Sequence, residues 1–226
     1  DASHAIGGQY QGKPIGCCEY SDITVFSFHP VKIVTSGEGG AALTNCPKLD
    51  SKLKLLRSHG ITRDVELMEY PSDDGWYYEQ IGLGYNYRMT DIHAALGLSQ
   101  LTRLHEYVER RHAIAARYDQ EFKGANLKIP YRNPANISAL HLYVIQVESS
   151  KHKLIFQKLR ESNIGVNLHY IPVHTQPYYQ KMGFKWGDFP NAEEYYKSAI
   201  SIPMFPTLNC SAQTEVIATM HEILAK

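Results

Sequence analysis

The sequence predicts a globular protein of mixed α/β class, and three observations support this. The chain has 226 residues, of which 43% are hydrophobic, so it can bury a sizeable core as one large domain or two small ones. Short runs of β-branched and aromatic residues alternate with longer segments whose apolar residues recur at helical spacing. No apolar run approaches the roughly 18 residues that a membrane-spanning helix needs.

Charge and cysteine content narrow the class of protein further. The 23 basic and 23 acidic side chains give zero formal net charge, and no Lys/Arg tract provides the clustered cations that bind nucleic acid or an anionic membrane. Cys17, Cys18, Cys46 and Cys210 lack the paired CxxC spacing of a zinc site and are too few for a disulfide scaffold. We therefore expect reduced thiols, a cytoplasmic location and a small-molecule partner.

The first part of the chain predicts two strands and a helix. Residues 23–28 form a β-branched and aromatic run, and residues 39–45 form a second strand, with Lys32 on the loop between them. A helix begins at Pro47, where proline is tolerated in the first turn, and its leucines recur at helical spacing until Gly60.

The middle of the chain predicts a long excursion followed by a long helix. Residues 61–84 have no sustained period, and loops of this length are usually functional or mobile. One apolar stripe then runs from the N-cap Thr90 to Phe122, and Gly124 ends it. A helix of this length can join two domains.

The last part of the chain predicts a compact α+β module. A strand at 142–147, a helix at 151–161 and a strand at 165–170 form a β-α-β unit. A short strand follows at 200–203.

Two more helices complete this module. Asn191 and Glu194 resemble a capping pair that opens a short helix. Ser211 is the expected N-cap of the final helix.

Lys32 is the most informative candidate for chemistry. It follows a strand in the segment Ser-Phe-His-Pro-Val-Lys and precedes a loop rich in small residues. An amine that attacks a carbonyl must be partly unprotonated, which requires a partly desolvated setting with few carboxylates nearby. Taken alone, a lysine on a loop is more often a solvated surface charge.

Asp1 and Ser27 change this interpretation. A pyridine-type cofactor held by lysine as an imine needs a carboxylate at the ring nitrogen, donors for a phosphate, and the lysine itself. Asp1, Ser27 and Lys32 supply one of each. Considered separately, Asp1 is better explained as a terminal charge and Ser27 as an ordinary strand-end serine.

Several blocks of sequence, in order, resemble the DegT/DnrJ/EryC1/StrS family of sugar aminotransferases, which carry pyridoxal 5'-phosphate on the fold of aspartate aminotransferase. The blocks are Asp-Ala-Ser-His-Ala-Ile-Gly at 1–7, Ser-Phe-His-Pro-Val-Lys at 27–32, Gly-Glu-Gly-Gly at 37–40, Gly-Tyr-Asn-Tyr-Arg-Met-Thr-Asp at 84–91, Asn-Leu-His-Tyr-Ile-Pro-Val-His at 167–174 and Ser-Ile-Pro-Met-Phe-Pro at 201–206. The resemblance covers nearly the whole chain. Within the family, the chain is most similar to the transaminases of pseudaminic acid biosynthesis.

The resemblance implies both the domain organisation and the cofactor site. Residues 1–123 are the remainder of the cofactor-binding large domain with its connecting helix, and residues 124–226 are a small α+β C-terminal domain. Lys32 is the Schiff-base lysine, Asp1 is the partner of the pyridine nitrogen, and His4 lies near the ring hydroxyl. Ser27 binds the cofactor phosphate, and Asn86 reaches the phosphate in the neighbouring subunit of a homodimer with shared active sites.

The resemblance also places the segment around His169, Tyr170 and His174 near the nucleotide-sugar substrate. The two histidines lack an HExxH helix or a third ligand in register, so we expect no metal there. An ordinary core or surface role remains equally open for either histidine. Aromatic clusters at 76–78, 178–179 and 195–196 can stack on uracil or pack a core.

The resemblance implies transfer of an amino group from an amino acid, expected to be glutamate, to the 4-keto carbon of a nucleotide-linked deoxysugar. A lysine at position 32 argues against the dehydratase branch of the family, in which histidine replaces it. Full-length members carry a Gly-Thr helix start and a ring-stacking aromatic before the first block, so we expect an N-terminally truncated chain. The alternative is a catalytically inactive fragment that serves as a dimerisation or nucleotide-sugar binding module.

Overall fold

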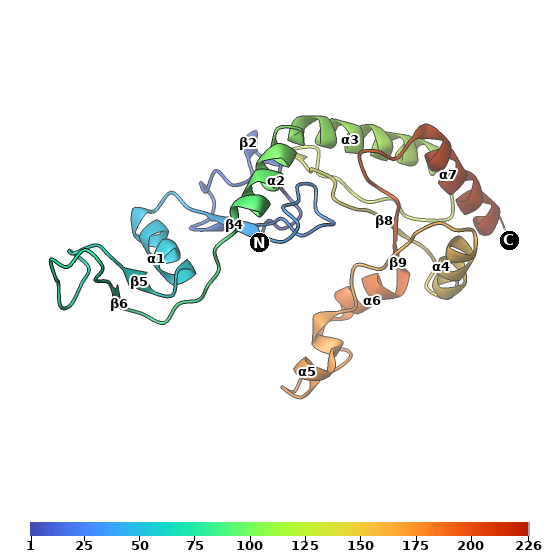
Figure 1. Cartoon of the computed structure of the whole chain (residues 1–226). Helices are drawn as coiled ribbons and strands as arrows, with labels where there is room; N and C mark the ends of the chain where they lie inside the picture. The colour runs from blue at the N-terminus through green and yellow to red at the C-terminus, as the bar shows by residue number, and fades with distance from the viewer. Residues whose placement is uncertain (226) are drawn as a thin grey trace. The chain divides into compact units, whose positions relative to one another are not determined.

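The computed structural model describes residues 1–225 and divides into two compact units. Unit 1 contains residues 1–105 and 135–139, and unit 2 contains residues 106–134 and 140–226. The structure has the expected mixed α/β composition (Figure 1). The expected domain boundary between residues 123 and 124 stays a prediction about the whole protein.

Unit 1 is built on an antiparallel strand pair. β3 (Thr24–Ser27) pairs with β4 (Gly40–Leu43) in the register Thr24↔Leu43 to Ser27↔Gly40, as the two predicted strands require. A small sheet of order β2-β1-β7 joins β1 (Gln9–Tyr10), β2 (Lys13–Pro14) and β7 (Asn136–Ile137).

The predicted helix after β4 is α1 (Pro47–Arg57), which has proline in its first turn. The segment 61–84 is not structureless, because β5 (Ile61–Thr62) and β6 (Glu79–Gln80) form a hairpin that supports a long loop (Figure 1). Two-residue strands are too short to give a detectable alternation in the sequence.

The single long helix predicted from Thr90 is wrong. The structure has α2 (Asp91–Leu101), capped by the Thr90 side chain as expected, and a separate α3 (Leu104–Glu121). At the break, the Thr102 hydroxyl donates to the carbonyl of Ser99 over 2.8 Å, and the Arg103 amide donates to Gln100 over 3.1 Å. These tighter bonds end α2, although the apolar stripe continues past them.

Unit 2 has a two-stranded antiparallel sheet enclosed by helices. β8 (Tyr143–Gln146) pairs with β9 (Ala199–Ile202), and both strands were expected. Helices α3, α4 (His152–Glu161) and α7 (Cys210–Leu224) surround the sheet and contribute to one continuous core (Figure 1). Its largest fully buried side chains include Tyr118, Tyr143, Phe122, Ile114 and Ile145.

The β-α-β unit predicted at 142–170 is wrong in its last strand. Only Asn167 pairs in that segment, through an isolated antiparallel bridge to Ser201. The Asn167 side chain accepts from the amide of Leu168 over 2.8 Å, which replaces a ladder bond with a local one.

The remaining elements form the end of the module. A 3₁₀ turn, η1 (Val173–Thr175), and α5 (Pro177–Gln180) precede α6 (Pro190–Ser198). Two capping predictions fail here, because Phe189 precedes α6 without a side-chain cap and Asn209, not Ser211, caps α7 by accepting from Ala212. In each case, the helix begins earlier than the expected cap.

Candidate functional site

The loop between β3 and β4 carries Lys32 and is closed by backbone hydrogen bonds. The amide of Phe28 donates to the carbonyl of Gly39 over 2.8 Å, and the amide of Ser36 donates to the carbonyl of Phe28 over 3.0 Å. The amide of Lys32 donates to the carbonyl of His29 over 2.9 Å. Lys32 therefore lies on a defined turn.

The Lys32 amine has the electrostatic setting that the sequence predicts. Its side chain is half-buried, and burial lowers the pKa of Lys32. The carboxylate on the same loop, that of Glu38, lies 3.9 Å from the ring of His29. A larger fraction of the Lys32 amine is therefore unprotonated and nucleophilic than in an exposed lysine.

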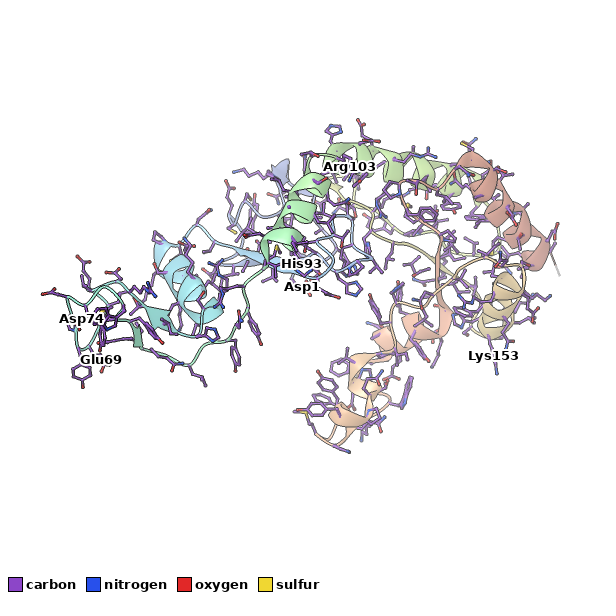
Figure 2. All side chains as sticks on the ribbon, viewed as in Figure 1. Asp1, Glu69, Asp74, His93, Arg103 and Lys153 are labelled. Atoms are coloured by element: carbon purple, nitrogen blue, oxygen red, sulfur yellow. The ribbon has the colours of Figure 1, made fainter. Side chains whose placement is uncertain are left out.

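Helix α2 packs on this loop through small residues. A Cβ atom added to Gly97 would lie 3.4 Å from the Ser36 side chain, and one added to Gly37 would lie 3.5 Å from the His93 ring. His93 is on the first turn of α2 (Figure 2). The close contact of α2 fixes the loop that carries Lys32.

Asp1 lies beside β3. The amide of Ala2 donates to the carbonyl of Val25 over 2.8 Å, which aligns the start of the chain with this strand. Oδ1 of Asp1 accepts from the amide of Ser3 over 2.9 Å and from its hydroxyl over 2.7 Å, so the exposed carboxylate has a fixed orientation. His4 is half-buried in the turn that follows.

Ser27 ends β3 at the entrance to the Lys32 loop. Its hydroxyl accepts a long hydrogen bond, 3.4 Å, from the amide of His29. Its strand partner is Gly40, where an added Cβ would lie 2.5 Å from the carbonyl oxygen of Phe26, so only glycine allows this approach. Ser27 therefore ends β3 and Lys32 lies on the loop that follows it, whereas Asp1 is next to Ala2, which bonds to Val25 of the same strand.

Asn86 lies elsewhere in unit 1. Its segment runs along the end of α1, where the amide of Tyr85 donates to Leu56 over 2.9 Å and the amide of Tyr87 donates to Arg57 over 3.0 Å. Tyr85 and Tyr87 stack on each other, and Asn86 between them is exposed. Among the hydrogen bonds of the described residues, none joins Asn86 to β3 or to Asp1.

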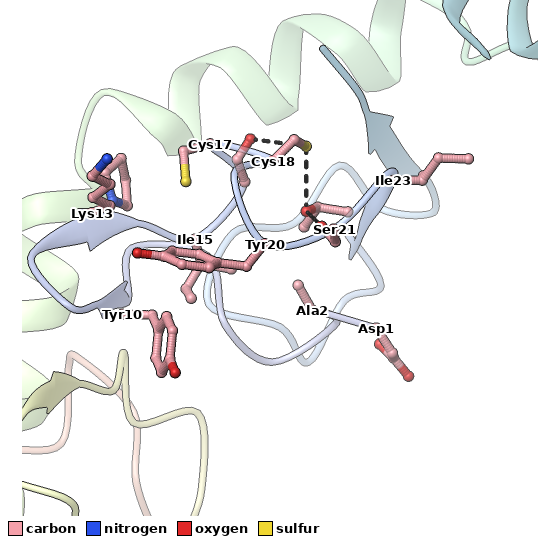
Figure 3. A pocket seen from close by; sticks show the side chains of 13 residues that line it. Asp1, Ala2, Tyr10, Lys13, Ile15, Cys17, Cys18, Tyr20, Ser21 and Ile23 are labelled. Atoms are coloured by element: carbon pink, nitrogen blue, oxygen red, sulfur yellow. Dashed lines mark hydrogen bonds between the residues drawn. The ribbon is translucent and has the colours of Figure 1, made fainter. Parts of the chain in front are cut away.

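A cavity of about 210 Å³ lies next to the start of the chain (Figure 3). Its lining includes Asp1, Tyr10, Lys13, Cys17 and Tyr20, but neither Ser27 nor Lys32. The cavity is therefore separate from the loop that carries the candidate amine.

In unit 2, His169 and Tyr170 lie together where the Asn167 segment meets β9. Nδ1 of His169 is 2.7 Å from the Ser201 hydroxyl, and the Tyr170 ring contacts the His169 ring edge-on, with centroids 4.6 Å apart. His169 is half-buried and Tyr170 is exposed. The two rings therefore form one fixed pair at the surface.

His174 is buried and paired with an acid. Its Nε2 lies 2.8 Å from Oε1 of Glu193, which also accepts from the amide of Gly187 over 2.7 Å. The rings of Trp186 and Phe189 contact the imidazole. This arrangement connects η1 with α6 and the intervening loop, so it gives His174 a structural role in unit 2.

We expect the Glu193 carboxylate to make the free energy of unfolding depend on pH. The hydrogen bond from His174 holds the pKa of Glu193 below its usual 4.5. The stabilisation is present above the unfolded-state pKa and is lost as the pH falls through the lower folded-state pKa. Urea unfolding at a series of pH values should show this loss in the wild type and a smaller loss in Glu193→Gln.

The matched control is Glu194→Gln, because Glu194 is the exposed neighbour on the same helix. It should retain the wild-type pH dependence. Equal slopes for wild type and Glu193→Gln would contradict the assignment.

The aromatic clusters considered for uracil stacking are mostly exposed. Trp76 and Tyr78 lie on the loop supported by the β5–β6 hairpin, where the Glu79 carboxylate accepts from the amides of Glu69 and Tyr70 at 2.6 and 2.7 Å. Figure 2 labels Glu69 on this loop. The pairs at 178–179 and 195–196 lie on α5 and α6. A stacking role for any of them stays a prediction.

Three negative observations apply to residues 1–225. No group of three or more His, Cys, Asp or Glu side chains is arranged to hold a metal ion there. No helix in that range has the length and apolar character needed to cross a membrane. All four cysteines are free thiols.

Comparison with known proteins gives the family of the chain. Residues 1–221 match the model of the DegT/DnrJ/EryC1/StrS aminotransferase family, so the chain belongs to that family. The prediction of the family from sequence is confirmed.

Named relatives give more detail. The chain is 38% identical to the UDP-4-amino-4,6-dideoxy-N-acetyl-β-L-altrosamine transaminase of Campylobacter jejuni, over 100% of this chain and 58% of the relative. It is similar to the solved structure of Helicobacter pylori PseC, an aminotransferase involved in the biosynthesis of pseudoaminic acid, with TM-score 0.89, 32% identity and coverage of 100% and 58%. It is equally similar to the putative sugar aminotransferase Spr1654 of Streptococcus pneumoniae in its PLP form, with TM-score 0.89, 31% identity and coverage of 100% and 57%.

The chain therefore spans less than three fifths of the length of these relatives. Spr1654 has been solved in PLP and PMP forms, so the cofactor predicted from the sequence is the one found in that relative. The mixed α/β class is confirmed, whereas the assignment of the units to a large and a small domain of the aspartate aminotransferase type stays a prediction.

Sequence reasoning missed two partners of the unit 2 histidines. Ser201 was noticed only as part of a motif, although a serine in the otherwise apolar strand Ala-Ile-Ser-Ile is a signal for a buried polar contact. Glu193 was overlooked in favour of Glu194, because no local pattern distinguishes the buried acid from the exposed one.

Proposed function

We propose that this chain is part of an enzyme that uses pyridoxal 5'-phosphate to transfer an amino group from glutamate to the 4-keto carbon of a nucleotide-linked deoxysugar. The observation that carries the proposal is the half-buried Lys32, with its lowered pKa, on the loop that follows β3. Ser27 ends this strand, and Ala2, next to Asp1, is hydrogen-bonded to it. Family membership supports the reaction class, and the transaminase relatives support a UDP-linked sugar of pseudaminic acid biosynthesis as the substrate.

The residues present fit the cofactor by their chemistry. A carboxylate held by two hydrogen bonds from Ser3, a strand-end hydroxyl and an amine whose pKa is lowered by burial are the three groups that a pyridine aldehyde phosphate requires. When bound, pyridoxal phosphate supplies an electron sink that stabilises negative charge on the carbon that loses a proton.

Each residue then has a role of its own in the proposal. Lys32 holds the cofactor covalently and, once released, moves a proton at its Nζ as general acid and base. Asp1 keeps a proton on the ring nitrogen, His4 lies at the ring hydroxyl and Ser27 binds the phosphate. Asn86 binds the phosphate of the neighbouring subunit in a homodimer, which is consistent with its exposure and its distance in sequence from Lys32.

We assign His169 and Tyr170 to substrate binding. The two rings lie edge to face, and Tyr170 exposes its phenol at the surface, where a nucleotide-sugar can contact it. We propose that His174 contributes to substrate binding indirectly. Its ring is buried against Glu193, so it holds the segment that carries His169 and Tyr170 and does not itself contact the substrate. We place the reaction in the cytoplasm, which the unpaired thiols favour.

The amino-donor half of the reaction tests the proposal. The chain is incubated with pyridoxal phosphate and L-glutamate, and 2-oxoglutarate is measured without an acceptor sugar. We expect its formation in stoichiometric amount with the chain and a change in the visible absorbance of the cofactor. Cofactor absorbance unaltered by glutamate, with no 2-oxoglutarate, would contradict the proposal and favour the non-catalytic binding module.

A further inference from the structure

The peptide bond between Asp74 and Gly75 lies at an exposed turn of unit 1. It belongs to the segment Pro-Ser-Asp-Asp-Gly-Trp at 71–76, on the loop supported by the β5–β6 hairpin, and Figure 2 labels Asp74 there. Asp74 is the one aspartate in the sequence that a glycine follows, and no asparagine precedes a glycine. Both Asp74 and Gly75 are exposed to solvent. The particular reactivity of an Asp–Gly bond is therefore confined to this loop.

The hydrogen bonds around Asp74 leave the amide of Gly75 unengaged. The Ser72 hydroxyl donates to Oδ2 of Asp74 over 3.0 Å and accepts from the Asp74 amide over 3.2 Å, which holds the carboxyl group beside its own backbone. The Asp74 carbonyl accepts from the amide of Tyr77 over 2.9 Å, which closes a four-residue turn. Within the described residues, the amide of Gly75 donates no hydrogen bond. Its nitrogen is therefore free to react with the neighbouring carboxyl group.

No side chain crowds this nitrogen. Gly75 has none of its own, and a Cβ atom built on it would meet no other heavy atom within 4 Å. The exposed Asp22 and Asp64 are instead followed by isoleucine and valine, whose branched Cβ atoms restrict rotation. Glycine adopts the widest range of backbone angles, so the chain can rotate until the nitrogen reaches Cγ of Asp74.

We propose that Asp74 is a site of spontaneous isoaspartate formation in the folded protein. The backbone nitrogen of Gly75 attacks Cγ of the protonated Asp74 side chain, an N–Cγ bond forms, and the amide proton and the side-chain hydroxyl leave as water. The five-membered succinimide then takes up one water at either carbonyl. Opening at the backbone carbonyl routes the chain through Cγ and frees an α-carboxylate. The inference is independent of the proposed function.

The product would alter the turn that leads to the exposed aromatic residues of this loop. The former Asp74 carbonyl becomes part of a free carboxylate, and the backbone gains one carbon, so the bond from the Tyr77 amide that closes the turn is lost. The Glu79 carboxylate still anchors the amides of Glu69 and Tyr70 and the hydroxyl of Tyr77, so the rearrangement is confined to the segment between these anchors. The new α-carboxylate is the group that a protein isoaspartate methyltransferase methylates.

Incubation of the full chain at neutral pH and physiological temperature tests the inference. After digestion, liquid chromatography with tandem mass spectrometry separates the isoaspartyl from the aspartyl form of the peptide that contains Asp74. We expect isoaspartate to accumulate there at a rate within about fivefold of that in a synthetic peptide of residues 69–79, because an exposed loop gives little protection. A slower rate in the chain would overturn the inference, since the fold would then protect this site.

Gly75→Ala is the matched variant, because the open space around Gly75 accepts a methyl group. It should lower the rate at Asp74 by about tenfold, since the added Cβ atom hinders ring closure. Asp50 is the internal control, because it is followed by serine within α1, where the helix holds the backbone, and it should stay unmodified. Equal rates in wild type and Gly75→Ala, or isoaspartate at Asp50 and none at Asp74, would overturn the inference. The wild-type measurement decides even if Gly75→Ala does not fold.

Discussion

Lys32→Ala should abolish covalent attachment of pyridoxal phosphate to the chain. In the wild type, addition of the cofactor should give a visible absorbance band, and borohydride should convert the adduct into a stable modification of the peptide that contains Lys32. The variant should give neither. The physical reason is that burial lowers the pKa of this amine, so a larger fraction of it is unprotonated than of an exposed lysine at the same pH.

The pH dependence of cofactor attachment provides a second test of Lys32. Because the pKa of Lys32 is lowered, attachment should reach half its maximum at a lower pH than it does for a free lysine derivative. Lys48→Ala is the matched control, since Lys48 is an exposed lysine on α1 in the same unit. Mass spectrometry that finds the cofactor on another lysine, or a band that persists in Lys32→Ala, would refute the assignment.

Tyr118→Ala should produce the largest loss of stability that we predict. Tyr118 on α3 is fully buried, stacks on Phe122, contacts Tyr143 and donates from its hydroxyl to the carbonyl of Pro203 over 2.9 Å. Truncation leaves a cavity and an unpaired carbonyl, so the free energy of unfolding should fall by about 4 kcal/mol. Chemical denaturation with urea measures this change.

Two further variants separate the contributions at this position. Tyr118→Phe keeps the ring and removes only the hydrogen bond, so it should cost about 1 kcal/mol. Tyr131→Ala removes an equal side chain that is 86% exposed and should change the free energy of unfolding little. A loss below about 1 kcal/mol in Tyr118→Ala would mean that this core does not hold unit 2 together.

Much of the local structure could be predicted because it depends on neighbours in the sequence. The strands β3, β4, β8 and β9 follow from apolar runs, and α2 begins where Thr90 caps it. The prediction of one helix over 90–122 failed because the apolar stripe continues past residue 102, whereas the helix ends there through local hydrogen bonds. The predicted strand at 165–170 failed because its pairing depends on β9, more than thirty positions further along the chain.

The sequence by itself determined the family, the mixed α/β class and the candidate residues, because motif residues and periodicity are local properties of the chain. Only the tertiary structure decided what the side chains contact. Burial lowers the pKa of Lys32, Glu193 pairs with His174, and the Ser201 hydroxyl contacts Nδ1 of His169. Burial and long-range contacts arise only when distant segments pack together. They therefore cannot be predicted from the spacing of residues in the sequence.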